Sequence, residues 1–97
     1  MRYKILGNSK RIEKHFLKII NSFSKEDQNT IWQTLLNDPK GDASSHWTIK
    51  KVYKDIWQLA LPRGYRLEYT VLDEERIVLV RFIGNHDDAA VFLRTKK

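Results

Sequence analysis

GYRLEYTVLDEERIVLVRFIGNHDDAAVF, residues Gly64–Phe92, has the clearest structural pattern in the chain. Apolar and polar side chains alternate, a charged turn follows, and the next run is rich in β-branched residues, which together predict a β-hairpin. With Leu72–Glu75 as the turn, Val71 pairs with Arg76 and the register of the whole hairpin follows. The predicted pairs of its apolar face are Tyr65 with Phe82, Leu67 with Val80, and Tyr69 with Val78.

The reverse face of this hairpin gives the first functional hypothesis. The same register places Arg66 directly opposite Arg81. Like charges paired across strands are unfavourable unless an anion lies between them, so the pair predicts an anion site with His86 beside it. Two alternatives stay open: Glu68 neutralises one arginine, or a different turn length separates the pair.

Composition predicts one globular domain, residues 1–97, with an anionic partner. The chain has 97 residues, 41% hydrophobic and 31% charged, with a net charge of +6. It contains no cysteine, which excludes disulfides and thiolate metal sites and is compatible with the cytoplasm, where we expect the protein. No apolar run approaches the length of a membrane span, and the charged start Met1–Lys4 does not resemble a signal peptide, so no membrane partner is expected.

The remaining segments predict a helical hairpin laid on a sheet. Asn8 or Ser9 caps a first amphipathic helix, and Ser24 begins a second, which ends before Pro39. The period between Trp47 and Lys54 is ambiguous and gives no assignment. The fold class is α+β, with element order β-α-α-β-β-β and a small, mixed, mostly antiparallel sheet covered on one face by the helices. Outside the hairpin, the expected strands are residues 2–6 and 56–61, and a short helix or strand follows at 89–93.

Two motifs carry a family resemblance. Gly64–Val71 followed by an apolar strand closing on Gly84 resembles the G-Y-R-L-x-Y pattern of the RelE/ParE superfamily of toxin–antitoxin toxins. Gly84–Asp88 is similar to the G-x-H-x-D ending of YafQ-like members. The resemblance implies a RelE/ParE-like fold and a type II toxin that cleaves mRNA on the ribosome without a metal or other cofactor. It also implies a cognate antitoxin as partner, with small oligomers formed through it.

The resemblance assigns chemistry to three positions. Arg66 matches a phosphate-contacting arginine of the family, and His86 matches a histidine proposed as general acid or base. Asp88 is expected to orient the His86 ring, although Asp87 and Asp88 alternatively only cap the following segment. Phe92 falls near a family tyrosine; phenylalanine transfers no proton but can stack a base. The further expected RNA contacts are basic: Lys50, Lys51, Lys54, Arg63 and Arg81.

Departures from the family pattern keep a second function open. RelE-like toxins present lysines on the strand before the arginine, where this chain has Gln58 and Ala60. Together with Phe92, these residues favour a non-enzymatic binder, such as a ParE-like inhibitor of DNA gyrase or a degenerate toxin that only engages a partner. The three histidines, His15, His46 and His86, are dispersed without paired spacing, which argues against a metal site.

Overall fold

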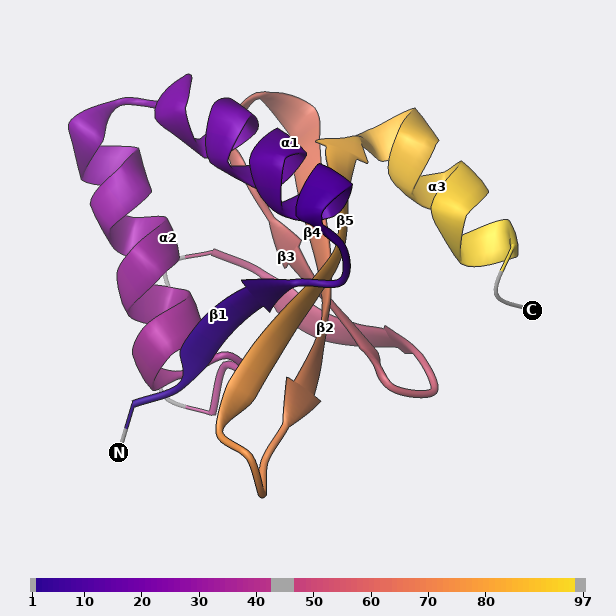
Figure 1. The fold of residues 1–97 in the computed structure, drawn as a ribbon. Coiled ribbons are helices and arrows are strands. Elements are labelled where there is room, and N and C mark those ends of the chain that lie inside the picture. The colour runs from indigo at the N-terminus through magenta and orange to yellow at the C-terminus, as the bar shows by residue number, and fades with distance from the viewer. Residues whose placement is uncertain (1, 43–46, 96–97) are drawn as a thin grey trace.

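The computed structural model describes residues 2–42 and 47–95 and shows three helices on a five-stranded mixed sheet (Figure 1). The sheet order is β1-β5-β4-β3-β2, with β1 parallel to β5 and every other neighbouring pair antiparallel. In chain order the elements are β1 (Lys4–Gly7), α1 (Lys10–Asn21), α2 (Lys25–Asn37), β2 (Ile49–Tyr53), β3 (Ile56–Ala60), β4 (Tyr65–Leu72), β5 (Ile77–Asn85) and α3 (His86–Arg94). The predicted α+β class is confirmed, with β2 added and the tail resolved as a helix.

The helical hairpin forms where its capping residues predict. Ser9 caps α1 by accepting a hydrogen bond from the Ile12 amide at 3.2 Å. Ser24 caps α2 by accepting one from the Asp27 amide at 3.1 Å. Each bond satisfies one of the amides that a helix start leaves without a partner. The two helices therefore begin at fixed points and together cover one face of the sheet (Figure 1).

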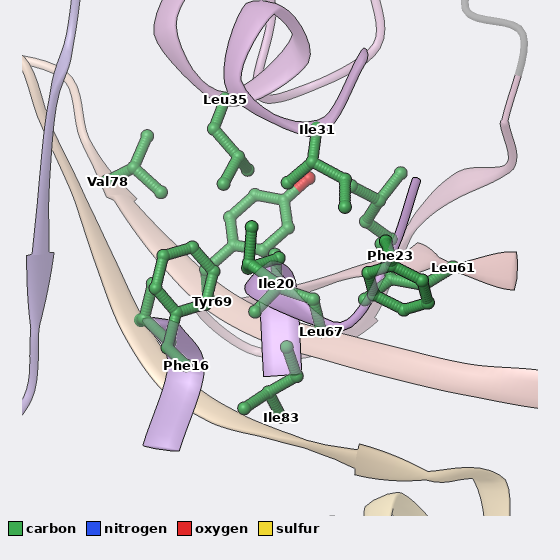
Figure 2. Close-up of a cluster of buried hydrophobic side chains, with 12 residues drawn as sticks. Phe16, Ile20, Phe23, Ile31, Leu35, Leu61, Leu67, Tyr69, Val78 and Ile83 are labelled. Carbon is green, nitrogen blue, oxygen red and sulfur yellow. The ribbon is translucent and has the colours of Figure 1, made fainter. Parts of the chain in front are cut away.

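The core lies between these helices and the sheet (Figure 2). Tyr69 is fully buried at its centre, and its hydroxyl donates a 2.6 Å hydrogen bond to the Pro39 carbonyl. This bond ties β4 to the loop after α2, and burial raises the pKa of the Tyr69 hydroxyl. The buried side chains around it come from both helices and three strands: Phe16, Ile20, Ile31, Leu35, Leu59, Leu67, Val78, Val80 and Ile83.

The predicted register of the β4–β5 hairpin is wrong. Leu72 pairs with Ile77, so the turn is Asp73–Arg76, with Arg76 in the left-handed conformation at φ 57°. This later turn pairs Tyr69 with Val80 instead of Val78. A β-bulge then shifts the register once more, as an extra residue on one strand does. The apolar face of β4 is as predicted, but Phe82 lies on the opposite face, where it pairs with Glu68 instead of Tyr65.

The register also corrects the predicted arginine pair. Arg81 is the extra residue of the bulge, between Val80 and Phe82, while Phe82 pairs with Glu68. Arg66 lies opposite Gly84. The two arginines are therefore not cross-strand partners, because turn position and bulge together displace β5 relative to the simple hairpin.

Candidate functional site

A second set of side chains lies on the side of the sheet opposite α1 and α2. Because Leu67 and Tyr69 face the core, alternation along β4 turns Glu68 to the other side. Glu68 pairs with Gln58 of β3 and with Phe82 of β5, and Gln58 pairs in turn with Lys50 of β2. Because cross-strand partners share a face, this surface extends over four strands. We call it the polar face and define it by Lys50, Gln58, Arg66, Glu68, Thr70, Arg81 and Phe82.

Glu68 is the buried centre of the polar face. Its side chain is fully buried, and Gln58 Nε2 donates to its Oε1 at 2.7 Å. Its Oε2 is also buried and has no hydrogen-bond partner among the described residues. Burial raises the pKa of the Glu68 carboxyl to about 7, although the hydrogen bond from Gln58 and the charges of Arg66 and Lys50 lower it. The face therefore holds a carboxyl that changes charge near neutral pH.

The burial of Glu68 was not predicted from the sequence. Alternation placed it on the reverse face of the hairpin, and because β4 is a central strand with neighbours on both sides, this position is buried. The helix α3 contacts β4 and β5, and its Phe92 ring stacks on Phe82 with centroids 5.2 Å apart. Gln58, which looked like lost catalytic charge, is the hydrogen-bond partner of this carboxyl.

Arg66 lies at the end of the polar face nearest α3. It is half-buried, pairs with Gly84 across the β4–β5 ladder, and donates from Nη1 to the Tyr65 carbonyl at 3.0 Å. A Cβ atom at Gly84 would lie 2.8 Å from the tip of the Phe82 ring. Because Gly84 has no side chain, the Phe82 ring has room to lie over it. Gly84 is the residue opposite Arg66.

His86 and Asp88 lie at the start of α3, at the same end of the sheet. Asn85 caps this helix by accepting from the Asp88 amide at 2.8 Å, and Asn85 itself pairs with Tyr65 beside Arg66. The exposed His86 Nδ1 is 3.7 Å from a carboxylate oxygen of Asp87, not of Asp88. Within the described residues, no hydrogen bond or ion pair joins His86 to Arg66 or to Asp88. The end of the sheet gathers the three predicted catalytic residues without linking them.

Arg81 is held apart from this end. Its Nη1 donates to the Thr70 hydroxyl at 3.1 Å and lies 3.9 Å from a carboxylate oxygen of Asp55, in the β2–β3 turn. Arg81 therefore contributes positive charge to the middle of the polar face, where the bulge directs it.

Comparison with known proteins agrees with this architecture. No family model matches the chain, and no curated protein matches it in sequence. Structures of E. coli toxin RelE with two arginine-to-alanine substitutions align with a TM-score of 0.58 in both cases. The alignment with the free form has 23% sequence identity and covers 95% of this chain and 92% of the RelE chain. The form in complex with an antitoxin RelBc peptide is 24% identical, with coverages of 100% and 97%.

An archaeal RelE from a RelE–RelB complex of Pyrococcus horikoshii aligns at a TM-score of 0.55, with 14% identity over 88% of this chain and 96% of that chain. The chain has the RelE toxin fold. The resemblance seen in the Gly64–Val71 motif is thereby confirmed at the level of fold.

On this RelE fold, the predicted RNA contacts divide between the two sides of the sheet. Lys50 pairs with Gln58 and lies on the polar face. Lys51 instead lies over the Trp57 ring, at 5.8 Å, and Trp57 packs against the core. Lys54 lies over Tyr53, at 5.9 Å, next to the β2–β3 turn.

Arg63 lies on the helix side of the RelE fold. Its guanidinium donates to the Ser22 hydroxyl at 3.0 Å and to the Ser22 carbonyl at 3.3 Å. The same group lies 4.6 Å from the centroid of the Phe23 ring. These contacts fasten the turn before β4 to the end of α1, which favours a structural role for Arg63.

Among residues 2–42 and 47–95, no three histidine, aspartate or glutamate side chains gather to hold a metal ion. In the same ranges, no helix is long and apolar enough to cross a membrane. His46, considered above as one of three dispersed histidines, lies outside the described residues.

Proposed function

We propose that this chain is the toxin of a type II toxin–antitoxin module and cleaves mRNA, acting on the ribosome in the cytoplasm. The observation that supports this most is the position of Arg66 beside the start of α3, which carries His86, on a RelE toxin fold. The net charge of +6 favours a polyanionic substrate.

The proposed reaction is an internal transfer of the phosphoryl group. The ribose 2′-oxygen attacks the adjacent phosphorus, the bond from phosphorus to the 5′-oxygen breaks, and a 2′,3′-cyclic phosphate remains. The 2′-hydroxyl loses a proton and the leaving 5′-oxygen gains one. His86 transfers a proton at one of these oxygens, while Arg66 stabilises the negative charge that develops on the phosphoryl oxygens. Amides at the N-terminus of α3 add partial positive charge at the same end of the sheet.

Four other residues have supporting roles in this proposal. Arg81 and Lys50 attract the RNA backbone along the polar face, where both lie. Asp88 contributes through the start of α3, since its amide bonds the cap Asn85. Glu68 is fully buried and does not touch RNA in this arrangement, but its charge interacts with that of Arg66 when it is ionised.

The test is to map RNA 5′ ends after induction of the wild-type protein and of its Arg66→Ala and His86→Ala variants. We expect new 5′ ends within translated codons for the wild type, and a loss of at least about a hundredfold for each variant, since each removes charge stabilisation or proton transfer. Arg2→Ala, an exposed arginine outside the site, is the matched control and should cleave as the wild type does. Variants that remain folded by circular dichroism and still cleave normally would contradict the site assignment.

A cognate antitoxin is part of the same proposal. The solved RelE structures include complexes with RelB and with an RelBc peptide, and this chain shares their fold. We expect an antitoxin to neutralise the toxin on binding and small oligomers to form through it. Co-expression with the product of the adjacent reading frame should restore growth, and a failure of every neighbouring product to do so would contradict this partner.

A non-enzymatic toxin is the second candidate, such as a ParE-like inhibitor of DNA gyrase. It is favoured by the position of Phe92, whose ring is stacked on Phe82 and carries no transferable proton. The same induction experiment separates the two functions. DNA-damage signalling without new RNA 5′ ends supports gyrase inhibition, whereas new ends within codons support the nuclease.

A further inference from the structure

A groove of about 670 Å³ lies between α1 and the free end of β5. Beyond Val80, β5 has no described partner strand on the β1 side, because β1 ends at Gly7, which pairs with Val80. There the chain leaves β1 and enters α1, whose side chains lie beside the free edge of β5. The groove is lined chiefly by Arg11, Ile12, Lys14, His15, Lys18 and Phe82.

The lining of this groove is basic around an apolar floor. Three of the lining residues carry permanent positive charge, and none of them is acidic. Glu13, the acidic residue in the first turn of α1, is directed elsewhere and accepts a 3.4 Å bond from the Gly7 amide. Ile12 and Phe82 line the same groove, and these large apolar side chains distinguish it from an ordinary solvated helix face.

Phe82 connects the groove with the polar face. It lines the groove, pairs with Glu68 across the sheet, and holds its ring over Gly84. Gly84 in turn lies opposite Arg66. A chain of direct neighbours therefore leads from the basic side chains of α1, past one aromatic ring, to the proposed phosphate contact.

We propose that this groove binds the single-stranded RNA segment that flanks the bond held at Arg66. The inference rests on the proposed function for its ligand. Lys14, Lys18 and Arg11 contact the phosphates, and a base packs on the apolar floor formed by Ile12 and Phe82. An acidic protein segment also suits positive charge, but continuity with the Arg66 site and the aromatic floor favour a nucleic-acid strand.

The test measures binding of a short, fluorescently labelled, single-stranded RNA by anisotropy at several salt concentrations. Its background is Arg66→Ala, so that the probe stays intact. Adding Lys14→Ala and Lys18→Ala should weaken binding about tenfold at low salt. The slope of log affinity against log salt should fall by about 1.4, because each phosphate contact with a single strand contributes about 0.7. The matched control is Lys10→Ala with Lys25→Ala, which removes the same charge from exposed positions outside the groove lining.

Equal weakening in the two double variants would overturn the inference, because it would show an effect of net charge alone. A labelled acidic peptide gives the other decisive outcome. If Lys14→Ala with Lys18→Ala abolishes peptide binding and leaves RNA binding at the control level, the groove is a protein-docking surface. Failure of the nuclease proposal looks different: RNA still binds through the groove, but no new RNA 5′ ends appear on induction.

Discussion

The two faces of the β-sheet are built on opposite principles, although neighbouring residues of one strand supply both. On the helix side, Leu67 and Tyr69 are fully buried among apolar side chains, and the single polar atom of Tyr69 has its partner in Pro39. On the polar face, Glu68 is buried to the same degree, yet one of its oxygens has no partner among the described residues. Burial stabilises the fold on the first face and opposes ionisation on the second.

This difference favours the polar face as the location of the functional groups. A buried carboxyl beside Arg66 and Lys50 costs stability that the apolar face has to offset. Natural proteins tolerate such local conflicts chiefly at functional sites. The contrast can be tested on adjacent residues of β4, where strand geometry is shared and only the face differs.

The largest expected effect is on the helix side. Leu67→Ala should lower the free energy of unfolding by about 3 kcal/mol, since it removes a fully buried side chain and leaves a cavity. Urea unfolding followed by circular dichroism measures the change. Leu17→Ala, an exposed leucine of α1, makes the same chemical change and should alter stability by less than about 0.5 kcal/mol. Similar losses in both variants would show that Leu67 is not a core residue.

For Glu68, one residue further along β4, a substitution is expected to change the free energy of unfolding in the opposite direction and by a smaller amount. Glu68 has its pKa raised from 4.5 to about 7, so between these values the folded chain binds more protons than the unfolded chain. Stability therefore falls as pH rises through this window, by at most about 3 kcal/mol, and levels off above it. Glu68→Gln should remove this fall and raise the free energy of unfolding at pH 8 by about 1–3 kcal/mol.

Unfolding by urea at pH 5 and at pH 8 measures both effects of Glu68→Gln. Glu75→Gln makes the same change in the exposed β4–β5 turn and should leave the pH dependence as in the wild type. The charged and polar groups known to face Glu68 are Lys50, Gln58 and Arg66, and all three partly support its ionised form. A wild type that gains stability from pH 5 to pH 8, with Glu68→Gln unchanged, would contradict the account of the polar face.

Local signals made much of the fold predictable. The serine caps and the apolar spacing of α1 and α2 are short-range features, and both helices begin where Ser9 and Ser24 place them. The strand β2 was not predicted, because Ile49–Tyr53 is an edge strand whose side chains follow no clean alternation. The register of β4 and β5 depends on Arg76 adopting a left-handed conformation and on a bulge at Arg81. Both residues are arginines, and an arginine in a sequence marks neither a left-handed turn position nor a bulge.

The candidate site was predictable only in part, for a related reason. Arg66 and His86 were found through motifs, and the structure places both at one end of the sheet. Glu68 and the α1 groove depend on contacts between distant segments: β3 and α3 for the first, and the free end of β5 for the second. Such properties arise only when distant segments come together in the folded chain, so side-chain alternation within one strand does not predict them.

The smallest expected effect on stability separates two arginines that were both predicted from the sequence to contact RNA, Arg66 at the phosphate and Arg63 elsewhere. The Arg63 guanidinium donates two hydrogen bonds to Ser22 and lies over the Phe23 ring. Arg63→Lys should therefore lower the free energy of unfolding by about 1 kcal/mol, because an ammonium group loses both contacts. Its RNA cleavage should remain that of the wild type, since Arg63 lies outside both the polar face and the lining of the α1 groove.

Arg66→Lys is the reciprocal change on the polar face. Arg66 bonds only the neighbouring Tyr65 carbonyl among the described hydrogen bonds, so stability should change by less than about 0.5 kcal/mol. Cleavage should fall at least about tenfold, because lysine lacks the planar fork that contacts two phosphoryl oxygens at once. Urea unfolding and 5′-end mapping on both variants give the comparison. If Arg63→Lys impairs cleavage as strongly as Arg66→Lys does, Arg63 contacts the RNA, and the structural role assigned to it is wrong.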